Sequence, residues 1–281
     1  MLKRMLAGIA ILAAMLAGQT QALAITDGDL DNGAHPFVGL MVAKAADGTP
    51  LWRCSGTLVT PMVFVTAGHC TEAPAAKAVI YFGDVVVSGT GGTAPNICAT
   101  GRVGYPCTGG STGTVHLIPS FDPNAFFLRD MGVVTLDAPA PGITTFARVP
   151  ALNSLDALKT GKSTFTSVGY GLQQSFPDAA AWKDVAIKQR MVAHPRLLQI
   201  NGGIVGDFSL LLSNNANTGG TCFGDSGGPN FVGDTAVIAG VTSFGRNSTC
   251  AGTGGIFRLD RGWSIDFVDL FLGGGQGGDG L

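Results

Sequence analysis

The chain has 281 residues, of which 46% are hydrophobic and 13% are charged, and its formal net charge at pH 7 is −2. This balance excludes an intrinsically disordered chain, which would be poor in apolar residues and strongly charged. It also provides no basic field, so we expect no nucleic-acid partner. The 43 glycines separate short apolar runs, and this pattern favours strands and tight turns over long helices.

The first 24 residues have the pattern of an export signal. Lys3 and Arg4 precede an apolar run over residues 5–17, and residues 22–24 read Ala-Leu-Ala, the small residues that a signal peptidase recognises. The alternative is a membrane anchor, but the run is short for a bilayer span and polar residues follow it. We therefore expect cleavage before Ile25, a secreted protein (extracellular or periplasmic), and no stable membrane association afterwards.

Six cysteines in an exported chain predict three disulfides, although the count alone leaves their pairing open. The sequence has no Cys-x-x-Cys pair, and a histidine and a cysteine are neighbours only at His69-Cys70. A zinc site is therefore disfavoured, and we expect neither a metal nor a cofactor. Cys98 and Cys107 lie within a Gly- and Thr-rich stretch, 88–113, which we interpret as a surface loop that a local Cys98–Cys107 bridge pins.

Short runs of alternating or β-branched residues, mostly bounded by Gly, Pro, Asn or Asp, predict antiparallel strands. They are Phe37 to Val42, Thr57 to Thr66, Val79 to Val87, Met131 to Leu136, Ser163 to Val168 and Val237 to Phe244. Residues 179–192 have a helical pattern without a clear N-cap. An apolar stripe between Trp263 and Leu270 predicts a short C-terminal helix, and the glycine-rich tail, 273–281, is expected to be flexible.

Prolines and polar residues interrupt the strands between residues 139 and 156. This change divides the exported chain into two β-rich halves. We place the first half at residues 25–145 and the second half, with the C-terminal helix, at residues 146–272.

The clearest chemical signal lies at residues 224–229, which read Gly-Asp-Ser-Gly-Gly-Pro. A serine such as Ser226 becomes a nucleophile when a base takes its proton, and the glycines leave backbone N–H groups exposed for an oxygen that becomes negative. Residues 66–70 read Thr-Ala-Gly-His-Cys and place His69, the usual base at neutral pH, after an apolar strand. Asp130 directly precedes another apolar strand, where it could orient that base.

These motifs resemble those of the chymotrypsin–trypsin family of secreted serine endopeptidases, and the resemblance covers nearly all of the chain after residue 24. Residues 25–28 with 35–37 are similar to the family's amino terminus, and residues 54–58 and 66–70 to its histidine region. Gly169-Tyr170-Gly171 resembles its Gly-Trp-Gly step, and Ser243-Phe244-Gly245 its substrate-binding strand. The fold that this resemblance implies is all-β, with two six-stranded antiparallel barrels, the active site between them and a short C-terminal helix.

The resemblance also implies a role for each matching residue. His69 would be the general base and then the general acid, Asp130 would orient it, and Ser226 would form an acyl-enzyme. The N–H groups of Gly224 and Ser226 would make the oxyanion hole. The remaining implied pairs are the disulfides Cys54–Cys70 and Cys222–Cys250 and an activating ion pair between the freed Ile25 amine and Asp225.

The implied substrate pocket has Gly220 as its floor, Gly245 and Gly255 as its walls, and Ser243 and Phe244 on the adjoining strand. An aspartate at the floor would select basic side chains, but Gly220 has no charge with which to offset the burial of a cation. We therefore expect protein or peptide substrates with a large apolar or aromatic side chain before the scissile bond. A monomer is the expected state.

The same residues also allow several other interpretations. Residues 224–228 also fit the Gly-x-Ser-x-Gly pattern of α/β-hydrolases, but that fold places its histidine after the serine, and all four histidines here precede Ser226. A binding protein that kept the fold and lost catalysis remains the alternative. Asp122 and Asp137 compete with Asp130, and Asn247 begins a glycosylation motif that matters only in a eukaryotic host. The other histidines, His35, His116 and His194, are interpreted as structural or surface residues.

Overall fold

The computed structural model describes residues 25–87, 109–173 and 188–273. The predicted export signal, the predicted Cys98–Cys107 bridge and residues 274–281 of the predicted tail lie outside the described residues.

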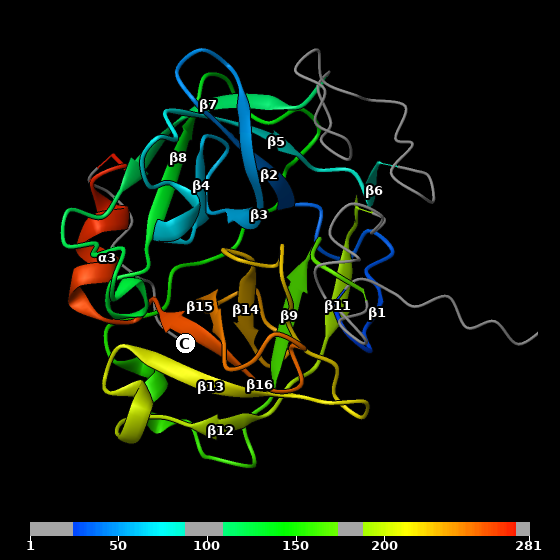
Figure 1. The fold of residues 1–281 in the computed structure, drawn as a ribbon, viewed down its shortest axis with the longest axis vertical. Coiled ribbons are helices and arrows are strands. Elements are labelled where there is room, and N and C mark those ends of the chain that lie inside the picture. Colours follow the sequence, from blue (N-terminus) through cyan, green and yellow to red (C-terminus); the bar gives the residue numbers. More distant parts are fainter. Residues whose placement is uncertain (1–24, 88–108, 174–187, 274–281) are drawn as a thin grey trace, which may run out of the picture.

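Six strands close into an antiparallel barrel, which occupies the upper part of Figure 1. In order around the barrel they are β2 (Val38–Lys44), β3 (Pro50–Leu58), β4 (Val63–Thr66), β8 (Gly132–Leu136), β7 (Ser111–Leu117) and β5 (Lys77–Tyr81). β2 and β4 consist mainly of apolar residues, and almost all of these are buried. Because a closed barrel has no free edge, each strand has backbone partners on both sides.

The second half is an eight-stranded antiparallel sheet that curls below the barrel (Figure 1). In order across the sheet the strands are β1 (Asp29–Leu30), β11 (Met191–Ala193), β9 (Phe165–Gly169), β14 (Pro229–Val232), β15 (Ile238–Gly245), β16 (Gly252–Arg258), β13 (Ser209–Asn214) and β12 (Leu197–Gln199). The family resemblance implied a second six-stranded barrel, and in the described chain it takes the form of this half-barrel sheet. One edge strand, β1, comes from the amino-terminal end of the chain.

Two predicted strands are each divided by a turn. The predicted strand over 57–66 contains the end of β3 and all of β4, and between them Thr60 Oγ1 accepts the N–H groups of Met62 and Val63. The predicted strand over 79–87 contains most of β5 and then β6 (Val85–Val87). In the first case a short polar side chain forms the local hydrogen bonds that let the chain reverse.

The helix predicted over residues 179–192 is wrong in its described part. Residues 188–189 form β10 (Lys188–Gln189), which pairs with β6, and residues 191–193 form β11 between β1 and β9. Met191 and Ala193 are buried while Val192 between them is half-buried, which is the two-residue period of a strand. Partners on both sides satisfy the backbone of β11 without a helix.

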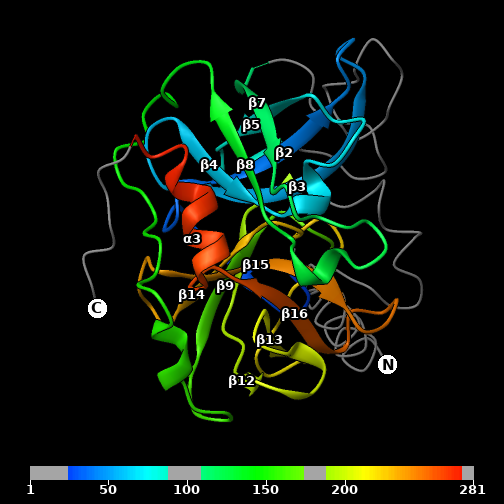
Figure 2. The same cartoon turned by 90° about the vertical axis from the view of Figure 1, so that its left-hand side faces the viewer.

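The predicted C-terminal helix is confirmed as α3 (Gly262–Asp269). The guanidinium carbon of Arg129 lies 4.1 Å from the ring centroid of Trp263 in α3, and the rings of His116 and Phe271 have centroids 4.6 Å apart. Arg129 and His116 belong to the first half, so α3 and the residues after it lie against both halves (Figure 2). Short 3₁₀ helices of the described chain are η1 (Gly68–Cys70), η2 (Phe126–Leu128), η3 (Ser154–Ala157) and η4 (Gly203–Val205). In the described ranges, no helix combines the length and the apolar character needed to cross a bilayer.

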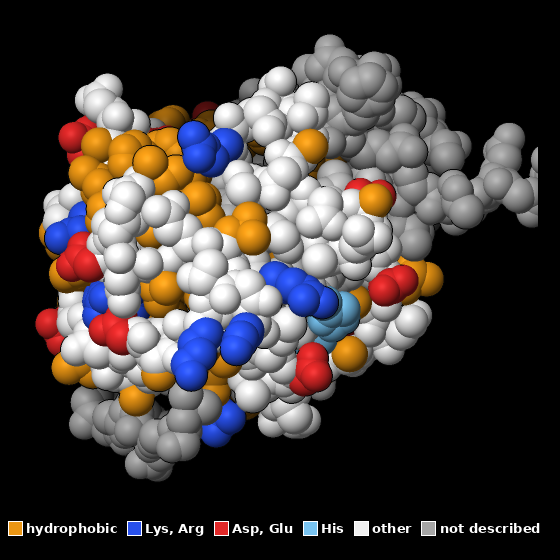
Figure 3. All heavy atoms as spheres, turned by 90° about the horizontal axis from the view of Figure 1, so that it is seen from below, with side chains coloured by type: hydrophobic (Ala, Val, Ile, Leu, Met, Phe, Trp, Pro, Cys, Tyr) orange, Lys and Arg blue, Asp and Glu red, His pale blue; other side chains and the backbone are white. Residues whose placement is uncertain are grey.

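A shared apolar core packs the two halves together. The main cluster of buried side chains contains Val38, Phe64 and Val134 from the barrel together with Phe231 and Phe257 from the sheet. Figure 3 shows the molecule from below, where separate basic and acidic side chains stand on a mainly uncharged surface. The halves therefore form one packed body around the line where they meet.

Candidate active site

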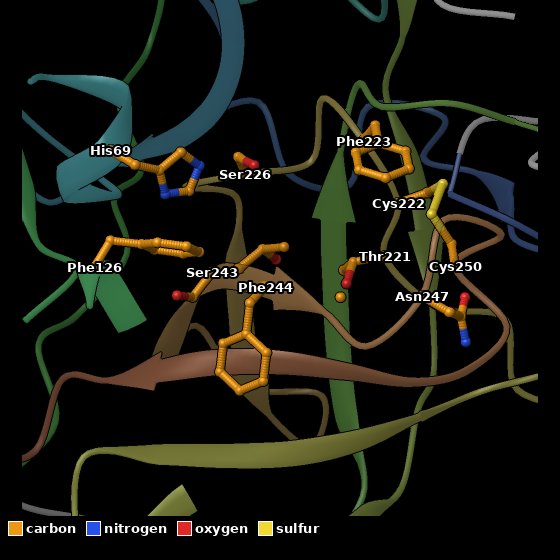
Figure 4. A pocket seen from close by; sticks show the side chains of 12 residues that line it. His69, Phe126, Thr221, Cys222, Phe223, Ser226, Ser243, Phe244, Asn247 and Cys250 are labelled. Carbon is orange, nitrogen blue, oxygen red and sulfur yellow. A yellow bond between two sulfur atoms is a disulfide. The ribbon is translucent and has the colours of Figure 1, made fainter. Parts of the chain in front are cut away.

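Two neighbouring strands of the barrel bring His69 and Asp130 together. β4 pairs with β8 so that Thr66 lies opposite Gly132. His69 follows Thr66 by three residues and Asp130 precedes Gly132 by two, so both lie beyond the same end of this strand pair. Ser226 comes from the other half of the molecule, in the loop before β14 (Figure 4).

Asp130 is fully buried and fixes the orientation of the His69 side chain. Its Oδ1 accepts the backbone N–H of His69 at 2.9 Å, and its Oδ2 lies 2.9 Å from Nδ1 of the imidazole. The hydroxyl of Ser243 in β15 donates to Oδ2 at 2.6 Å. Because Asp130 accepts a hydrogen bond from Nδ1–H of the imidazole, a neutral His69 has the lone pair on Nε2, which faces the site.

The same contacts set the basicity of His69. Burial acts to lower the pKa of His69, but the charge and hydrogen bond of Asp130, with a smaller effect of Glu72, raise it above its ordinary value. A neutral ring with a raised pKa is a stronger proton acceptor, as a general base requires.

Ser226 and His69 line the same cavity. No hydrogen bond joins their side chains in the described chain, and Figure 4 shows the Ser226 hydroxyl turned away from the imidazole. A rotation of the serine side chain would turn Oγ towards the ring. Hydrogen bonds of this kind are often long or absent before a substrate binds.

Two backbone N–H groups near the Ser226 hydroxyl have no acceptor among the described residues: those of Gly224 and of Ser226 itself. Neighbouring backbone N–H groups do have acceptors: that of Asp225 donates to Cys222 O, and that of Gly228 donates to Asp225 O. Gly224 has a φ of +97°, which a residue with a side chain rarely adopts, so the turn requires glycine. Two unpaired donors beside a serine can stabilise an oxygen that becomes negative.

Asp225 is fully buried and accepts two backbone N–H groups, from Gly171 at 2.7 Å and from Cys222 at 2.8 Å. Burial raises the pKa of Asp225 to about 7, although both donors act to lower it. No cationic side chain of the described residues pairs with it. Ile25, its predicted partner, is also fully buried, and the residue after it forms a β-bridge with Gly220. The two predicted partners thus lie in adjoining segments, and their ion pair stays a prediction.

A cavity of about 320 Å³ opens beside Ser226. Three of the predicted substrate-binding residues, Ser243, Phe244 and Gly245 of β15, line it. Among its described lining residues His69 is the one that can carry a charge. The full lining is His69, Phe126, Thr221, Cys222, Phe223, Ser226, Thr242, Ser243, Phe244, Gly245, Asn247 and Cys250.

Two predicted pocket residues, Gly220 and Gly255, are not part of this lining. A Cβ on Gly220 would collide with the side chain of Asn214, and one on Gly255 would collide with the ring of Phe244. On the neighbouring Gly254, by contrast, a Cβ would lie 2.9 Å from the hydroxyl of Thr221, a lining residue. The strand pairing shifts by one residue near Phe244, and sequence spacing does not reveal such a shift.

The sequence analysis did not identify Phe126, Thr221, Phe223 and Asn247 as pocket residues, although they also line the cavity. Thr221 and Phe223 precede the serine motif so closely that its position could have pointed to them. Phe126 packs edge-to-face on His69 with ring centroids 5.4 Å apart. The position of Phe126 depends on the fold of η2 before Asp130, and no local sequence pattern identifies Phe126 as a site residue.

The predicted disulfides Cys54–Cys70 and Cys222–Cys250 are both present. Cys70 adjoins His69, and the second bridge forms part of the cavity wall. In the described residues, the one group of potential metal ligands is His69 with Cys54 and Cys70. These two sulfurs are bonded to each other, so they provide no thiolate for a metal.

The competing residues lie elsewhere. Asp122 and Asp137 are exposed and bond to Asn124 and Thr112. The remaining histidines make structural contacts: His35 with Asp31, His116 with Thr135, and His194 with Thr166. The side chain of Asn247 is exposed and bonded within its own turn, and its glycosylation stays a prediction.

Comparison with known proteins agrees with this geometry. The family model described as "Trypsin" matches residues 30–259. A search of curated protein sequences finds no match. Among solved structures, HL collagenase has 19% identity and a TM-score of 0.65, over 89% of this chain and 99% of that chain.

Two further solved structures with the same fold are described as proteins other than active proteases. Human heparin binding protein has 19% identity and a TM-score of 0.58, over 85% of this chain and 92% of its own. An inactivated protease paralogue of the scabies mite has 15% identity and a TM-score of 0.62, over 89% and 98%. These likenesses establish the fold, and the family match covers most of the sequence. The chain is therefore a member of the trypsin-like serine protease family, with the chymotrypsin fold.

Proposed function

We propose that the protein is a secreted serine endopeptidase that cleaves peptide bonds through an acyl-enzyme. The observation that carries the proposal is the buried Asp130 that holds His69 beside Ser226. The unpaired N–H groups of Gly224 and Ser226 add the donors that the reaction needs. These features match the division of roles in a serine–histidine–aspartate triad.

Each group has a defined task in the proposed reaction. Ser226 Oγ attacks the substrate carbonyl carbon while its proton passes to His69 Nε2, and the carbonyl oxygen becomes negative between the two free N–H groups. His69 then gives the proton to the leaving amine, which leaves Ser226 acylated. His69 takes a proton from water as the water attacks the ester carbon, and then returns that proton to Ser226 Oγ as the acyl–oxygen bond breaks and the acid leaves. Asp130 stays ionised and stabilises the imidazolium formed in each half of the cycle.

The alternative function is a catalytically silent protein that binds through this fold, since such proteins occur among its structural neighbours. Loss of catalysis usually leaves a trace in the triad. Here His69, Asp130 and Ser226 are all present, and Ser243 anchors the aspartate as well. Activity is therefore the better-supported proposal.

The cavity beside Ser226 supports a preference for a large apolar or aromatic side chain before the scissile bond. Phe223, Phe244 and the Cys222–Cys250 bridge provide apolar wall, and the described lining contains no acidic side chain. A Lys or Arg side chain would lose its hydration there without gaining a partner charge.

Export and activation complete the proposal. Disulfides persist in oxidising compartments, and the two that the structure contains support a secreted protein. Removal of residues 1–24 would free the amine of Ile25 close to the buried Asp225. We expect the enzyme to act as a monomer on protein or peptide substrates, without a metal or cofactor.

One labelling experiment tests activity and preference together. A protein that begins at Ile25 is treated with two serine-directed phosphonates, one with a benzyl and one with an aminobutyl side chain. We expect labelling at Ser226, with the benzyl probe at least roughly tenfold faster because a cation would be desolvated without a partner. Ser226→Ala should abolish labelling, and the exposed Ser248→Ala should leave it unchanged. Folded wild-type protein that reacts with neither probe would establish the silent alternative.

A further inference from the structure

A buried serine on the barrel, Ser55 in β3, makes four hydrogen bonds next to the candidate active site. Its hydroxyl donates to Gly224 O at 3.0 Å, and its backbone N–H donates to Ser226 O at 2.8 Å. Its own carbonyl accepts the hydroxyl of Thr66, three residues before His69, at 2.8 Å. Ser55 is fully buried, so water does not compete for these bonds.

The hydroxyl of Ser55 is also an acceptor. The backbone N–H of Tyr170 donates to it at 3.0 Å, and the next N–H along the chain, that of Gly171, donates to Asp225. The hydroxyl therefore donates to the partly buried carbonyl of Gly224 and accepts from the buried N–H of Tyr170, and both groups belong to the second half of the molecule. Without it, two polar backbone groups would be left without this partner.

The bonds of Ser55 lie on either side of the peptide that carries the free N–H of Ser226. The peptide group before it joins Gly224 to Asp225. Both of its polar atoms are hydrogen-bonded, because Gly224 O accepts from Ser55 Oγ and Asp225 N–H donates to Cys222 O. The following peptide is held in the same way, because Ser55 N–H binds Ser226 O and Gly227 N–H binds Thr242 O. The peptide between them keeps its N–H unpaired.

Gly224 is the point at which this arrangement is most easily lost. It has no side chain to restrict its rotation, and its φ of +97° is one of several conformations open to glycine. The bond from Ser55 Oγ fixes the direction of its carbonyl and so limits the rotation of its own N–H group. Donors to a developing negative oxygen act well only when they are already in place.

We propose that Ser55 is a positioning residue for catalysis: its hydroxyl holds the Gly224–Ser226 backbone so that both N–H groups remain directed at the reacting carbonyl oxygen. The proposal depends on the proposed protease function for its catalytic consequence. The predicted role is specific to the transition state, since Ser55 touches neither the substrate pocket nor the His69 ring.

The test uses Ser55→Ala and Ser55→Gly, which both remove the hydroxyl and keep the backbone N–H. We expect kcat on a peptide substrate to fall roughly tenfold in both variants, while KM stays within about twofold, because the loss concerns transition-state stabilisation. The affinity for a peptide boronic acid, whose boron adds to Ser226 and carries a negative oxygen, should fall by a similar factor. Thr57→Val removes another buried hydroxyl of β3, one that bonds to Phe37 O, and should change none of these values.

A second measurement does not depend on activity. Hydrogen–deuterium exchange of the Asp225, Gly227 and Gly228 amides should become faster in Ser55→Ala than in wild type or Thr57→Val. Unchanged kcat and boronic-acid affinity, an equal loss in Thr57→Val, or failure of both Ser55 variants to fold would overturn the proposal. A wild type without any turnover would instead refute the protease function, and the exchange comparison would still decide whether Ser55 holds the loop.

Discussion

Asp130 is a buried carboxylate that organises the side chains of the candidate site. It is fully buried, yet it accepts hydrogen bonds from the His69 backbone, the His69 ring and the Ser243 hydroxyl. These donors stabilise its negative charge in place of water. That charge in turn raises the pKa of His69 against the opposing effect of burial.

Replacing Asp130 by asparagine should change both the rate and its pH dependence. In the proposed reaction the base is neutral His69, so activity should rise as pH increases through the His69 pKa. Without the negative charge that pKa falls, and the acid limb of the kcat/KM profile should move to lower pH. The plateau should drop by a factor on the order of 10⁴, because an amide also favours the wrong imidazole tautomer. The pH–rate profile on an activated ester measures both effects.

The exposed acid Asp122 supplies the matched control. Asp122→Asn alters a charge in the same half of the molecule but outside the His69 environment, and its profile should coincide with that of wild type. If Asp130→Asn kept the wild-type plateau, the assignment of Asp130 would be wrong.

At this scale the sequence singled out three residues that the structure brings to one site, but it described the pocket less well. His69, Asp130 and Ser226 each stand in a short motif tied to a strand end, and local sequence was enough to find them. Gly220 and Gly255 are not among the residues that line the described cavity, and the register shift in the strand pair that contains Gly255 is not visible in sequence spacing. Phe126 reaches the site only through the folded path of η2.

The short strands β1 and β11 depend on a buried arginine. Arg190 precedes β11 and pairs with Asp31, which follows β1, at 2.7 Å, and both side chains are almost completely buried. The guanidinium also donates to the Val38 and Phe82 carbonyls and forms an ion pair with Asp84. It thereby joins the amino-terminal segment to the barrel and to the sheet.

Replacing Arg190 by methionine should lower the free energy of unfolding by about 3 kcal/mol. The substitution keeps apolar volume but leaves Asp31 buried without its cationic side chain, and breaking one side of a buried pair is costly. Urea denaturation followed by tryptophan fluorescence measures the change. Arg196→Met removes an exposed arginine of the same half and should alter stability by less than about 0.5 kcal/mol. Equal stabilities of the two variants would rule out a structural role for the buried pair.

The strands and helices also show where a local sequence pattern fails to predict the secondary structure. The apolar run over 57–66 resembles a single strand because the turn at Thr60 interrupts it with only one polar side chain. The described part of the predicted helix over 179–192 forms strands, because neighbouring strands supply backbone partners that a local pattern does not reveal. The C-terminal helix was found correctly, and Phe267 and Val268 of its apolar stripe are buried, whereas Leu270 at its end is exposed.

At the scale of the whole molecule, the described segment that begins at Ile25 adjoins the segment before the Ser226 loop, because Thr26 forms a β-bridge with Gly220. Ile25 is fully buried, and Asp225 is a buried acid without a cationic partner among the described residues. A positive charge delivered to this position would keep Asp225 ionised, although burial raises the pKa of this acid to about 7. A free amine at Ile25 can provide that charge, and an amide bond to Ala24 cannot.

Two proteins that differ by one residue test this expectation. The form that begins at Ile25 should react with the benzyl phosphonate at least about tenfold faster than the form that begins at Ala24, because an ordered nucleophile loop supports the oxyanion donors. In an Asp225→Asn background the added alanine should have little further effect, since the two changes act on one interaction. Equal reactivity of the two wild-type forms, or active secreted protein that starts before Ile25, would contradict the proposed activation.

The hydrogen bond from Ser243 to Asp130 crosses between the two halves of the molecule. Separation of the halves would therefore remove Ser226 from the site and also take the Ser243 hydrogen bond from the acid that orients His69. Each half contributes to the chemistry of the other, so neither can retain a working fragment of the machinery. Enzymatic activity should consequently report domain docking more sensitively than any spectroscopic signal of secondary structure, and its loss should mark the first step of disassembly.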